Sequence, residues 1–396
     1  MEYFYRKIYL IIILLFTLLS FLGCDNHTTS VDQNKQQLFF DVSNWELNKL
    51  IPEEVIANVE FVPLETDENF LIGQVNKILV YNDIFYVLDK SSKQIFVFDM
   101  SGKFIQKIGV YGRGPGEYIR LNDFIVDTSR NRILTLDSYQ RKILMYDLTD
   151  GKSLGEIKLD FWATNFTMVG NNTLFFFMKN TYFQNYENYS LVSLNLKDLS
   201  KKEYFLEIDE YNVTLSYHYS MYKSNNVYYC PYLKDVVYEI EEDGVIPAVK
   251  FNFGDHKISE EKLKSFRLNN GKNLTQVLFD NDCTYGIKNF LESDNFLSFK
   301  IKIQNKSTLV VYCKETGNYH YGSAFEGVLN GFRSVETVAL TNQKFIGFID
   351  SYSFIRMQKR INIEPHTQIV KNYNKILKRV SSNSNPVIIL IEYNQF

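Results

Sequence analysis

A glycine-rich loop holds the densest group of residues that could do chemistry. It reads Gly112-Arg-Gly-Pro-Gly-Glu-Tyr118 and combines a cation, Arg113, with the carboxylate of Glu117 and the phenol of Tyr118. Arginine binds anionic oxygens through two parallel hydrogen bonds, so Arg113 facing a central channel could bind an anion. The loop lacks the Gly-Lys-Ser/Thr ending of a phosphate-binding loop. Arg113, Glu117 and Tyr118 are therefore our candidate binding residues.

The same loop also has a structural interpretation. Its glycines would supply φ > 0, Pro115 would stiffen a turn, and Arg113 would pair with Glu117 or with a neighbouring part of the fold. An Arg113→Ala substitution separates the two interpretations. Lost binding at unchanged stability indicates a site, whereas a lower melting temperature indicates a structural role.

No group of residues in the sequence predicts a catalytic site. Asp89, Asp99, Asp137 and Asp147 could act as paired carboxylates, but each follows a strand-like run, where aspartate commonly caps a turn. The five histidines include no HxH or HxxxH pair, and no GxSxG nucleophile elbow occurs. The sequence therefore predicts no catalytic residue, no metal ligand and no cofactor. A site assembled from distant segments would escape this search.

Tyrosines gather over 182–189 and 217–232. Tyrosine has a stiff apolar face and a polar tip, which suits an aromatic platform for sugars or peptides. Ordinary packing of strands is the alternative explanation. Cys230, Cys283 and Cys313 are an odd number of thiols, so at least one is unpaired. We expect small buried core residues with at most one disulfide, whose pairing the sequence leaves open.

The composition favours strands as the elements that position these residues. The chain has 396 residues, is 45% hydrophobic and carries a formal net charge of −3, with no basic patch that would predict a nucleic-acid partner. It contains 32 Phe and 28 Tyr but only 7 Pro. Aromatic side chains pack well on a pleated surface, so an all-β body is expected.

A four-stranded unit repeats along this body. Apolar runs over 78–108 predict four short strands separated by turn residues. The pattern returns over 123–157, where Asp137 and Asp147 follow Asp89 and Asp99 at a spacing of 48 residues. A repeat of about this length with four strands is the signature of a β-propeller blade. Looser copies are expected over 166–206, 217–251, 287–321 and 335–391.

The last copy has only three strands of its own. Val59–Leu64 is expected to supply the fourth, and its Pro63 favours an edge or a strand end. Such closure protects sheet edges. Short helices are expected at 259–266 and 368–380. The predicted fold class is all-β: a six-bladed β-propeller of four-stranded antiparallel blades, with short helical insertions and an N-terminal strand closing the last blade.

The N-terminus has the layout of a secretory signal. Arg6 and Lys7 precede an apolar run that ends at Gly23-Cys24, and the run is shorter than the roughly 20 residues that span a bilayer. Phe21-Leu-Gly-Cys24 resembles the lipobox of bacterial lipoproteins, with Phe21 in place of the commoner Leu. We predict a signal peptide at 1–23, a lipidated Cys24 with a flexible tether at 24–37, and a single propeller domain at 38–396.

Several motifs carry a resemblance to a known family. They are Val59-Glu-Phe-Val-Pro-Leu-Glu65, Ile95-Phe-Val-Phe-Asp99, Gly112 to Tyr118 and Asn385-Pro-Val-Ile-Ile-Leu390. From about Val59 to its end the chain resembles the six-bladed beta-propeller family of Gram-negative bacterial lipoproteins, related in form to NHL-repeat propellers. The resemblance implies the fold and export far more than a function, because most members have no assigned activity. The third and fourth blades lack an equivalent of the glycine loop.

Three hypotheses for function follow. The first is a non-enzymatic, lipid-anchored binding module of the cell envelope, with a small molecule, glycan, peptide or envelope protein as its ligand. The second is a propeller enzyme of the lactonase or lyase type. The third is a structural component of an envelope complex. The outer membrane is the expected location, and the sequence does not identify the leaflet.

Overall fold

The computed structural model describes residues 37–179, 188–209, 220–268, 274–303, 306–326, 335–358 and 367–396. Tight turns join neighbouring strands within these ranges. Asn82 and Asp83 have φ of 50° and 56° and connect β4 (Lys77–Tyr81) to β5 (Ile84–Asp89). Two consecutive residues with φ > 0 match the twist of antiparallel strands, which explains the hairpin. Residues 1–36, which include the predicted signal peptide and Cys24, lie outside the described residues.

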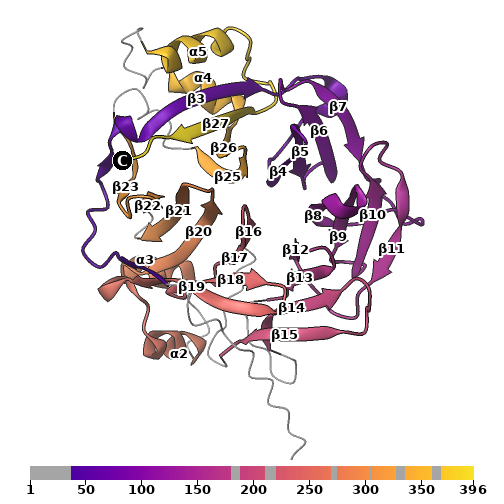
Figure 1. Ribbon diagram of the computed structural model, residues 1–396, viewed down its shortest axis with the longest axis horizontal. Helices are drawn as coiled ribbons and strands as arrows, with labels where there is room; N and C mark the ends of the chain where they lie inside the picture. The colour runs from indigo at the N-terminus through magenta and orange to yellow at the C-terminus, as the bar shows by residue number, and fades with distance from the viewer. Residues whose placement is uncertain are drawn as a thin grey trace, which may run out of the picture. The chain divides into compact units, whose positions relative to one another are not determined.

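Residues 37–396 form one compact unit whose strands make six blades around a central axis (Figure 1). The strands within each blade are antiparallel, and the predicted six-bladed β-propeller is confirmed. Blade 1 continues from β4 and β5 with β6 (Gln94–Asp99) and β7 (Phe104–Ile108), and blade 2 comprises β8 (Leu121–Asp127), β9 (Arg132–Asp137), β10 (Lys142–Asp147) and β11 (Ser153–Lys158).

The later blades follow the same order from the innermost strand outward. Blade 3 comprises β12 (Asn165–Val169), β13 (Thr173–Phe177), β14 (Tyr189–Asn195) and β15 (Lys202–Glu207), and blade 4 comprises β16 (Met221–Lys223), β17 (Val227–Tyr229), β18 (Val236–Glu241) and β19 (Gly244–Asn252). Blade 5 comprises β20 (Thr284–Glu292), β21 (Phe296–Ile303), β22 (Lys306–Cys313) and β23 (Tyr319–Gly322), and blade 6 comprises β25 (Glu336–Thr341), β26 (Lys344–Ile349), β27 (Val387–Tyr393) and β3 (Ile56–Pro63).

The N-terminal segment fastens the ring. Strand β3 pairs antiparallel with β27 at the outer edge of blade 6, and Pro63 stands at its end, as predicted. The segment makes two further contacts that the sequence pattern did not predict. Strand β1 (Leu38–Asp41) is a parallel fifth strand on β19 of blade 4, and β2 (Leu50–Ile51) pairs in parallel with β24 (Ala324–Phe325). One segment thus bridges the second half of the ring.

Helices lie between strands at the periphery. The predicted helices are present as α2 (Glu260–Leu268) and α5 (Gln368–Leu377), and the structure adds α3 (Leu274–Asp280) and α4 (Ser351–Met357). Phe61 of β3 packs against Phe354 of α4 and Tyr373 of α5, with ring centroids 5.6 and 5.9 Å apart. Single-turn 3₁₀ helices occur at Glu53–Val55, Glu68–Phe70, Thr128–Arg130 and Gly254–His256. No helix in the described residues is long and apolar enough to cross a membrane.

The hydrophobic core lies between blades. Leu134 of blade 2 and Phe176 of blade 3 are both fully buried and belong to one cluster, and Phe96 of blade 1 shares another with Ile346 of blade 6. A single blade therefore cannot bury its apolar faces without its neighbours. This packing holds the innermost strands in fixed positions around the axis.

Candidate functional site

The innermost strands surround a cavity of about 510 Å³, which we call the channel cavity. Strands β4, β8, β12, β16, β20 and β25 all contribute to its wall and stand nearest the axis in Figure 1. Its volume lies within the range of about 300–1,000 Å³ that is usual for ligand sites. Apolar side chains such as Leu79, Ile125 and Phe166 alternate on the wall with polar ones. The cavity therefore suits a ligand with both apolar and polar parts.

The polar lining of the channel cavity is one-sided in charge. Lys77 of β4, Lys223 of β16 and Lys288 of β20 line it, whereas no Asp or Glu of the described ranges does. The whole chain has a formal net charge of −3, so this wall departs from the composition of the protein. A cavity with cations on its wall and little competing water favours anions. Sequence reasoning missed these lysines, because they lie far apart in the chain and no short-range motif connects them.

Lys77 is held by a buried carboxylate behind the wall. Its Nζ donates to Asp123 Oδ1 at 2.7 Å and to the Phe124 carbonyl oxygen at 2.9 Å. Asp123 is 1% exposed, and its other oxygen, Oδ2, accepts from the Phe166 backbone N–H at 3.0 Å. One carboxylate thus connects the innermost strands of the first three blades. This pairing orients Lys77 and offsets its charge.

Lys223 has no such counterion. Its Nζ donates to the Met168 carbonyl oxygen at 3.0 Å, and none of the ion pairs among the described residues includes it. The side chain is exposed to the solvent of the channel, but the surrounding strands remove part of its hydration. This partial burial, reinforced by the neighbouring Lys77 and opposed by Asp127, lowers the pKa of Lys223. Lys223 is the cation in the channel cavity that is best placed to accept an anionic partner.

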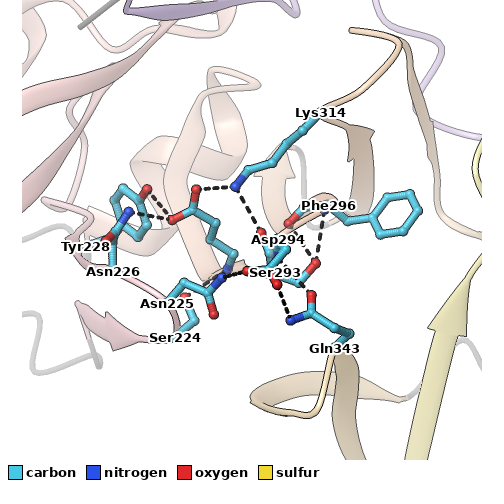
Figure 2. A network of polar contacts seen from close by, with 10 residues as sticks. Ser224, Asn225, Asn226, Tyr228, Ser293, Asp294, Phe296, Lys314 and Gln343 are labelled. Carbon is cyan, nitrogen blue, oxygen red and sulfur yellow. Dashed lines mark hydrogen bonds and ion pairs between the residues drawn. The ribbon is translucent and has the colours of Figure 1, made fainter.

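A polar network lies where the innermost strands end and their turns begin, on a side of the ring that we call the turn face; Figure 2 shows its contacts. Ser224, Asn225 and Gln343 of this network line the channel cavity. Glu292 of β20 is 8% exposed and accepts from Tyr228 Oη at 2.7 Å and Asn226 Nδ2 at 2.9 Å. Its other oxygen pairs with Lys314 Nζ at 2.6 Å. Burial and the neighbouring carboxylate raise the pKa of Tyr228, which keeps its hydroxyl protonated as a donor. Glu292 therefore binds blade 4 to blade 5.

The network extends to blade 6 through the next turn (Figure 2). Asn225 Nδ2 donates to Asp294 Oδ1 at 2.6 Å, and Gln343 Nε2 donates to Asp294 Oδ2 at 2.9 Å. The Asp294 backbone N–H donates in return to Gln343 Oε1 at 2.8 Å. Asn225 and Gln343 also line the channel cavity. This part of the cavity wall is therefore fixed by side chains that are already engaged with one another.

A second cavity of about 690 Å³ lies on the opposite, crossover face, where loops connect each blade to the next. We call it the crossover-face cavity. Lys90, Lys93 and Arg120 line it together with Tyr139 and Trp162, and no Asp or Glu in the described part of the chain lines it. It is formed by the turns within blades 1 and 2 and by the loops that lead into blades 2 and 3. Sequence reasoning placed no candidate residue here.

Asp137 holds the loops around this cavity in place. The residue is fully buried. Its Oδ1 accepts from the backbone N–H groups of Tyr139 and Gln140, both at 2.9 Å. Its Oδ2 accepts from the backbone N–H groups of Ile119 at 2.7 Å and Arg120 at 3.2 Å. One carboxylate therefore fixes both a turn within blade 2 and the loop that carries Arg120.

Asp89 does the same in blade 1. Its Oδ1 accepts from the Ser91 N–H and its Oδ2 from the Gly73 N–H, both at 2.8 Å. Asn76 supports this arrangement by accepting the Lys90 N–H at 2.7 Å. We call these two aspartates with their bonded loops the crossover clamps. The predicted role of the aspartates as turn caps is confirmed, and Asp99 and Asp147 cap turns in the same way.

The predicted glycine loop stands near this cavity without lining either cavity. Tyr118 is fully buried, and its hydroxyl donates to the Lys93 carbonyl oxygen at 2.7 Å. Glu117 accepts the Gly114 N–H at 2.7 Å. Arg113 is exposed, and within the described part of the chain it forms no ion pair with Glu117. The contacts of Glu117 and Tyr118 stabilise the loop, and Gly116, with φ of 74°, supplies the positive φ expected there.

Other candidates divide between the core and the channel. Tyr222, Tyr228 and Tyr229 are all buried, and Tyr222 also lines the channel cavity. Tyr182, Tyr186, Tyr217 and Tyr219 lie outside the described residues. Cys230, Cys283 and Cys313 are buried and unpaired, which agrees with the core interpretation. Within the ranges described, no group of three or more His, Cys, Asp and Glu side chains could hold a metal ion.

Comparison with known proteins shows the family and the fold. The family model described as "Domain of unknown function (DUF4934)" matches residues 39–392. The crystal structure of a predicted exported protein from Bacteroides fragilis NCTC 9343 is similar, with a TM-score of 0.73 at 19% sequence identity, over 91% of this chain and 100% of that chain. At this identity the likeness shows the fold alone. A search of curated proteins finds no match.

Two further solved structures show weaker likeness. A member of the duf4221 family from Bacteroides vulgatus ATCC 8482 has a TM-score of 0.49 at 10% identity, over 86% of this chain and 97% of that chain. A streptogramin B lyase has a TM-score of 0.44 at 13% identity, over 74% of this chain and 82% of that chain. Similarity at this level carries no argument about activity.

Proposed function

The chain belongs to this family, whose description names no activity, and we propose that it is a binding module for a small organic anion held in the channel cavity. Lys223 carries the proposal. Among the described residues its only hydrogen-bond partner is a neutral carbonyl, and no carboxylate of those residues lines the cavity. A buried or crowded ammonium gains most from a charged partner that replaces its lost water. The apolar part of the wall favours an anion with a hydrocarbon or aromatic body.

Two sulfur-containing probes test this proposal. Naphthalene-2-sulfonate has an apolar body and one negative charge, and naphthalene-2-sulfonamide has nearly the same shape without the charge. Isothermal titration calorimetry should show binding of the sulfonate and much weaker binding of the sulfonamide. Lys223→Met should weaken sulfonate binding by about tenfold or more, because it removes a charge-assisted contact. Lys223→Arg should retain most of the affinity.

A matched control separates this site from general charge effects. Lys197 is exposed in the turn after β14, and its side chain forms no hydrogen bond or ion pair among the described residues. Lys197→Met removes the same charge and should leave sulfonate binding unchanged. The proposal fails if both probes bind equally well, or if Lys197→Met and Lys223→Met lower the affinity to the same extent. Circular dichroism and melting curves of each variant verify the fold.

We also propose that the module is anchored in the cell envelope, at the outer membrane, by a lipid on Cys24. The support is the lipobox-like Phe21-Leu-Gly-Cys24 after an apolar run, followed by a polar segment that ends where the described structure begins. Two or more acyl chains give stable attachment, whereas one is marginal. Expressed in a Gram-negative bacterium, the wild-type chain should enter the detergent phase of a Triton X-114 extract. Cys24→Ser should move it to the aqueous phase, and an aqueous wild-type chain would refute the anchor.

A further inference from the structure

The crossover-face cavity offers hydrogen-bond donors with few acceptors. Lys90, Lys93 and Arg120 line it, and the side chain of Arg120 has no hydrogen bond or ion pair in the described part of the chain. Lys93 lies over the ring of Tyr111, with its Nζ 3.6 Å from the ring centroid. This contact leaves the charge of Lys93 without a counterion, because the Tyr111 ring is neutral. Three cations therefore face one cavity that no carboxylate lines.

Two buried amides add further donors to the same wall. Asn122 is 8% exposed and Asn165 is 3% exposed. The oxygen of Asn122 accepts the Ser138 N–H at 3.1 Å, and the oxygen of Asn165 accepts the Thr164 hydroxyl at 3.1 Å. Their Nδ2 groups have no partner among the described residues. Both residues line the cavity, so these amide groups can donate to a ligand that carries acceptor atoms.

Aromatic rings complete the wall. Trp162 and Tyr139 both line the cavity and are 40% and 70% exposed. Many large aromatic side chains among the described residues are buried, whereas these two reach the solvent. An exposed ring beside polar donors presents a flat apolar face and keeps its polar tip in water. Such a face packs against the C–H face of a sugar ring.

We propose that the crossover-face cavity binds an acidic saccharide. Its sulfate or carboxylate groups pair with Arg120, Lys93 and Lys90, while a sugar ring lies on Trp162. Guanidinium binds either acid through two parallel hydrogen bonds. The Asn122 and Asn165 amides donate to ring or hydroxyl oxygens. The volume of about 690 Å³ holds more than one sugar residue.

The hydrogen-bond donors on the wall also disfavour two other ligands, a neutral sugar and a nucleotide. A neutral sugar presents hydroxyl donors and gains most from carboxylate acceptors, which this wall lacks. A nucleotide could place its phosphates on the cations, but the edge of its base carries N–H donors. The two amide oxygens that could accept them are already engaged by Ser138 and Thr164. An acceptor-rich ligand with a flat apolar face fits the wall better than either.

Tryptophan fluorescence can report binding at this cavity, because the chain has only two tryptophans and one of them, Trp162, lines it. Trp45 stacks on Tyr321 with ring centroids 4.1 Å apart, away from the cavity, so a Trp45→Phe background leaves Trp162 as the single tryptophan. Titration with a chondroitin 4-sulfate hexasaccharide and with trigalacturonate should quench or shift Trp162 emission. Response to the first alone identifies sulfate as the recognised acid, and response to the second shows that carboxylate suffices. Maltohexaose should give no response.

Variants assign the response to the cavity. Arg120→Met in the same background should weaken binding of the responding saccharide by about tenfold, and Lys93→Met should have a similar effect. Lys197→Met is the matched control and should bind like the parent. Lys223→Met alters the channel cavity and should also bind like the parent, so this result does not depend on the proposed anion site. No response to either acidic saccharide, an equal response to maltohexaose, or tighter binding of ATP would overturn the proposal.

Discussion

The two faces of the ring use buried carboxylates in different ways. On the crossover face, Asp89 and Asp137 recur at equivalent positions of blades 1 and 2 and accept backbone N–H groups from nearby loops. On the turn face, the buried carboxylates that end two innermost strands accept from side chains instead. Asp127 of blade 2 accepts from Ser129 and Arg132. Glu292 of blade 5 accepts from Tyr228 and Asn226 while pairing with Lys314. The first kind of carboxylate binds the backbone of nearby loops, whereas the second depends on the side chains that surround it.

This difference shows at which positions residues can change while the six blades keep their arrangement. A backbone N–H is present whatever residue occupies a position, so a crossover clamp tolerates changes in the loop it holds. The Glu292 network requires specific partners from separate blades. Around the crossover-face cavity, residue types such as Arg120 can therefore differ while the loop keeps its position. The following predictions test this contrast.

The largest loss of stability is expected for Asp137→Ala. The substitution leaves four backbone N–H groups without their acceptor around a fully buried position, and water can replace only part of the loss. We expect a decrease of about 4 kcal/mol in the free energy of unfolding, measured by urea denaturation. Asp150→Ala, at an exposed turn position, should cost less than about 0.5 kcal/mol. A loss below about 1 kcal/mol for Asp137→Ala would contradict the clamp.

Glu292→Ala should have a somewhat smaller effect. It leaves the buried Tyr228 hydroxyl without an acceptor, but Asn226 is exposed and Lys314 is 31% exposed, so both of these can be rehydrated. We expect a decrease of about 3 kcal/mol in the free energy of unfolding. Glu203→Ala, on an exposed outer strand, is the matched control and should be nearly neutral. Equal losses in the two variants would show that the network contributes little.

Tyr228→Phe tests one bond of that network. It removes the hydroxyl that donates to Glu292 at 2.7 Å and keeps the ring that packs on Phe290. We expect a loss of about 1–1.5 kcal/mol, because Asn226 and Lys314 still satisfy the carboxylate. Tyr139→Phe, at a side chain that is 70% exposed, should leave stability unchanged. If Tyr228→Phe costs as much as Glu292→Ala, the network acts as one unit and not as separate bonds.

The smallest expected effect is a decrease in the stabilisation by Asp89 at acidic pH. Burial alone would raise the pKa of Asp89, but hydrogen bonds from Ser91, Gly73 and Ser92 together lower it. A carboxyl whose pKa is lower in the folded state stabilises the protein above its unfolded pKa of about 3.9. That stabilisation is lost as the pH falls below about 4 and through the folded pKa. The difference in unfolding free energy between the wild type and Asp89→Asn should therefore shrink between pH 5 and pH 3. A constant difference would contradict the clamp in blade 1.

Much of the fold was predictable because its signals are local. Asp89 and Asp137 each end a strand and begin a turn, so their spacing shows the repeat directly. Val59–Leu64 was assignable to blade 6 because one strand was missing there and Pro63 restricts a strand to an edge. Strand β1 was not predicted, since its four residues pair in parallel with a strand more than two hundred residues away. Nothing in the local pattern of Leu38–Asp41 specifies that partner.

The binding residues were less predictable than the fold. The residues of the glycine loop around Arg113 became binding candidates because they are adjacent in sequence. In the structure, Glu117 and Tyr118 form contacts within the loop and with its surroundings. Lys77, Lys223 and Lys288 are single lysines in ordinary strand patterns. Their common feature is the position in the innermost strand of a blade. Binding by Arg113, Glu117 and Tyr118 remains a prediction that Arg113→Ala can test.

The sequence by itself determined the blades, because alternating apolar residues, turn residues and a repeated aspartate act over a few positions. It also determined the N-terminal signal pattern that ends at Cys24. Only the tertiary structure decided which side chains share a cavity. Closing the ring brings Lys77 and Lys223, which are far apart in the chain, to one wall, and it places Arg120 and Trp162 around another. The physical reason is that a blade buries its faces only against its neighbours, so packing between blades, and not local pattern, sets these distances.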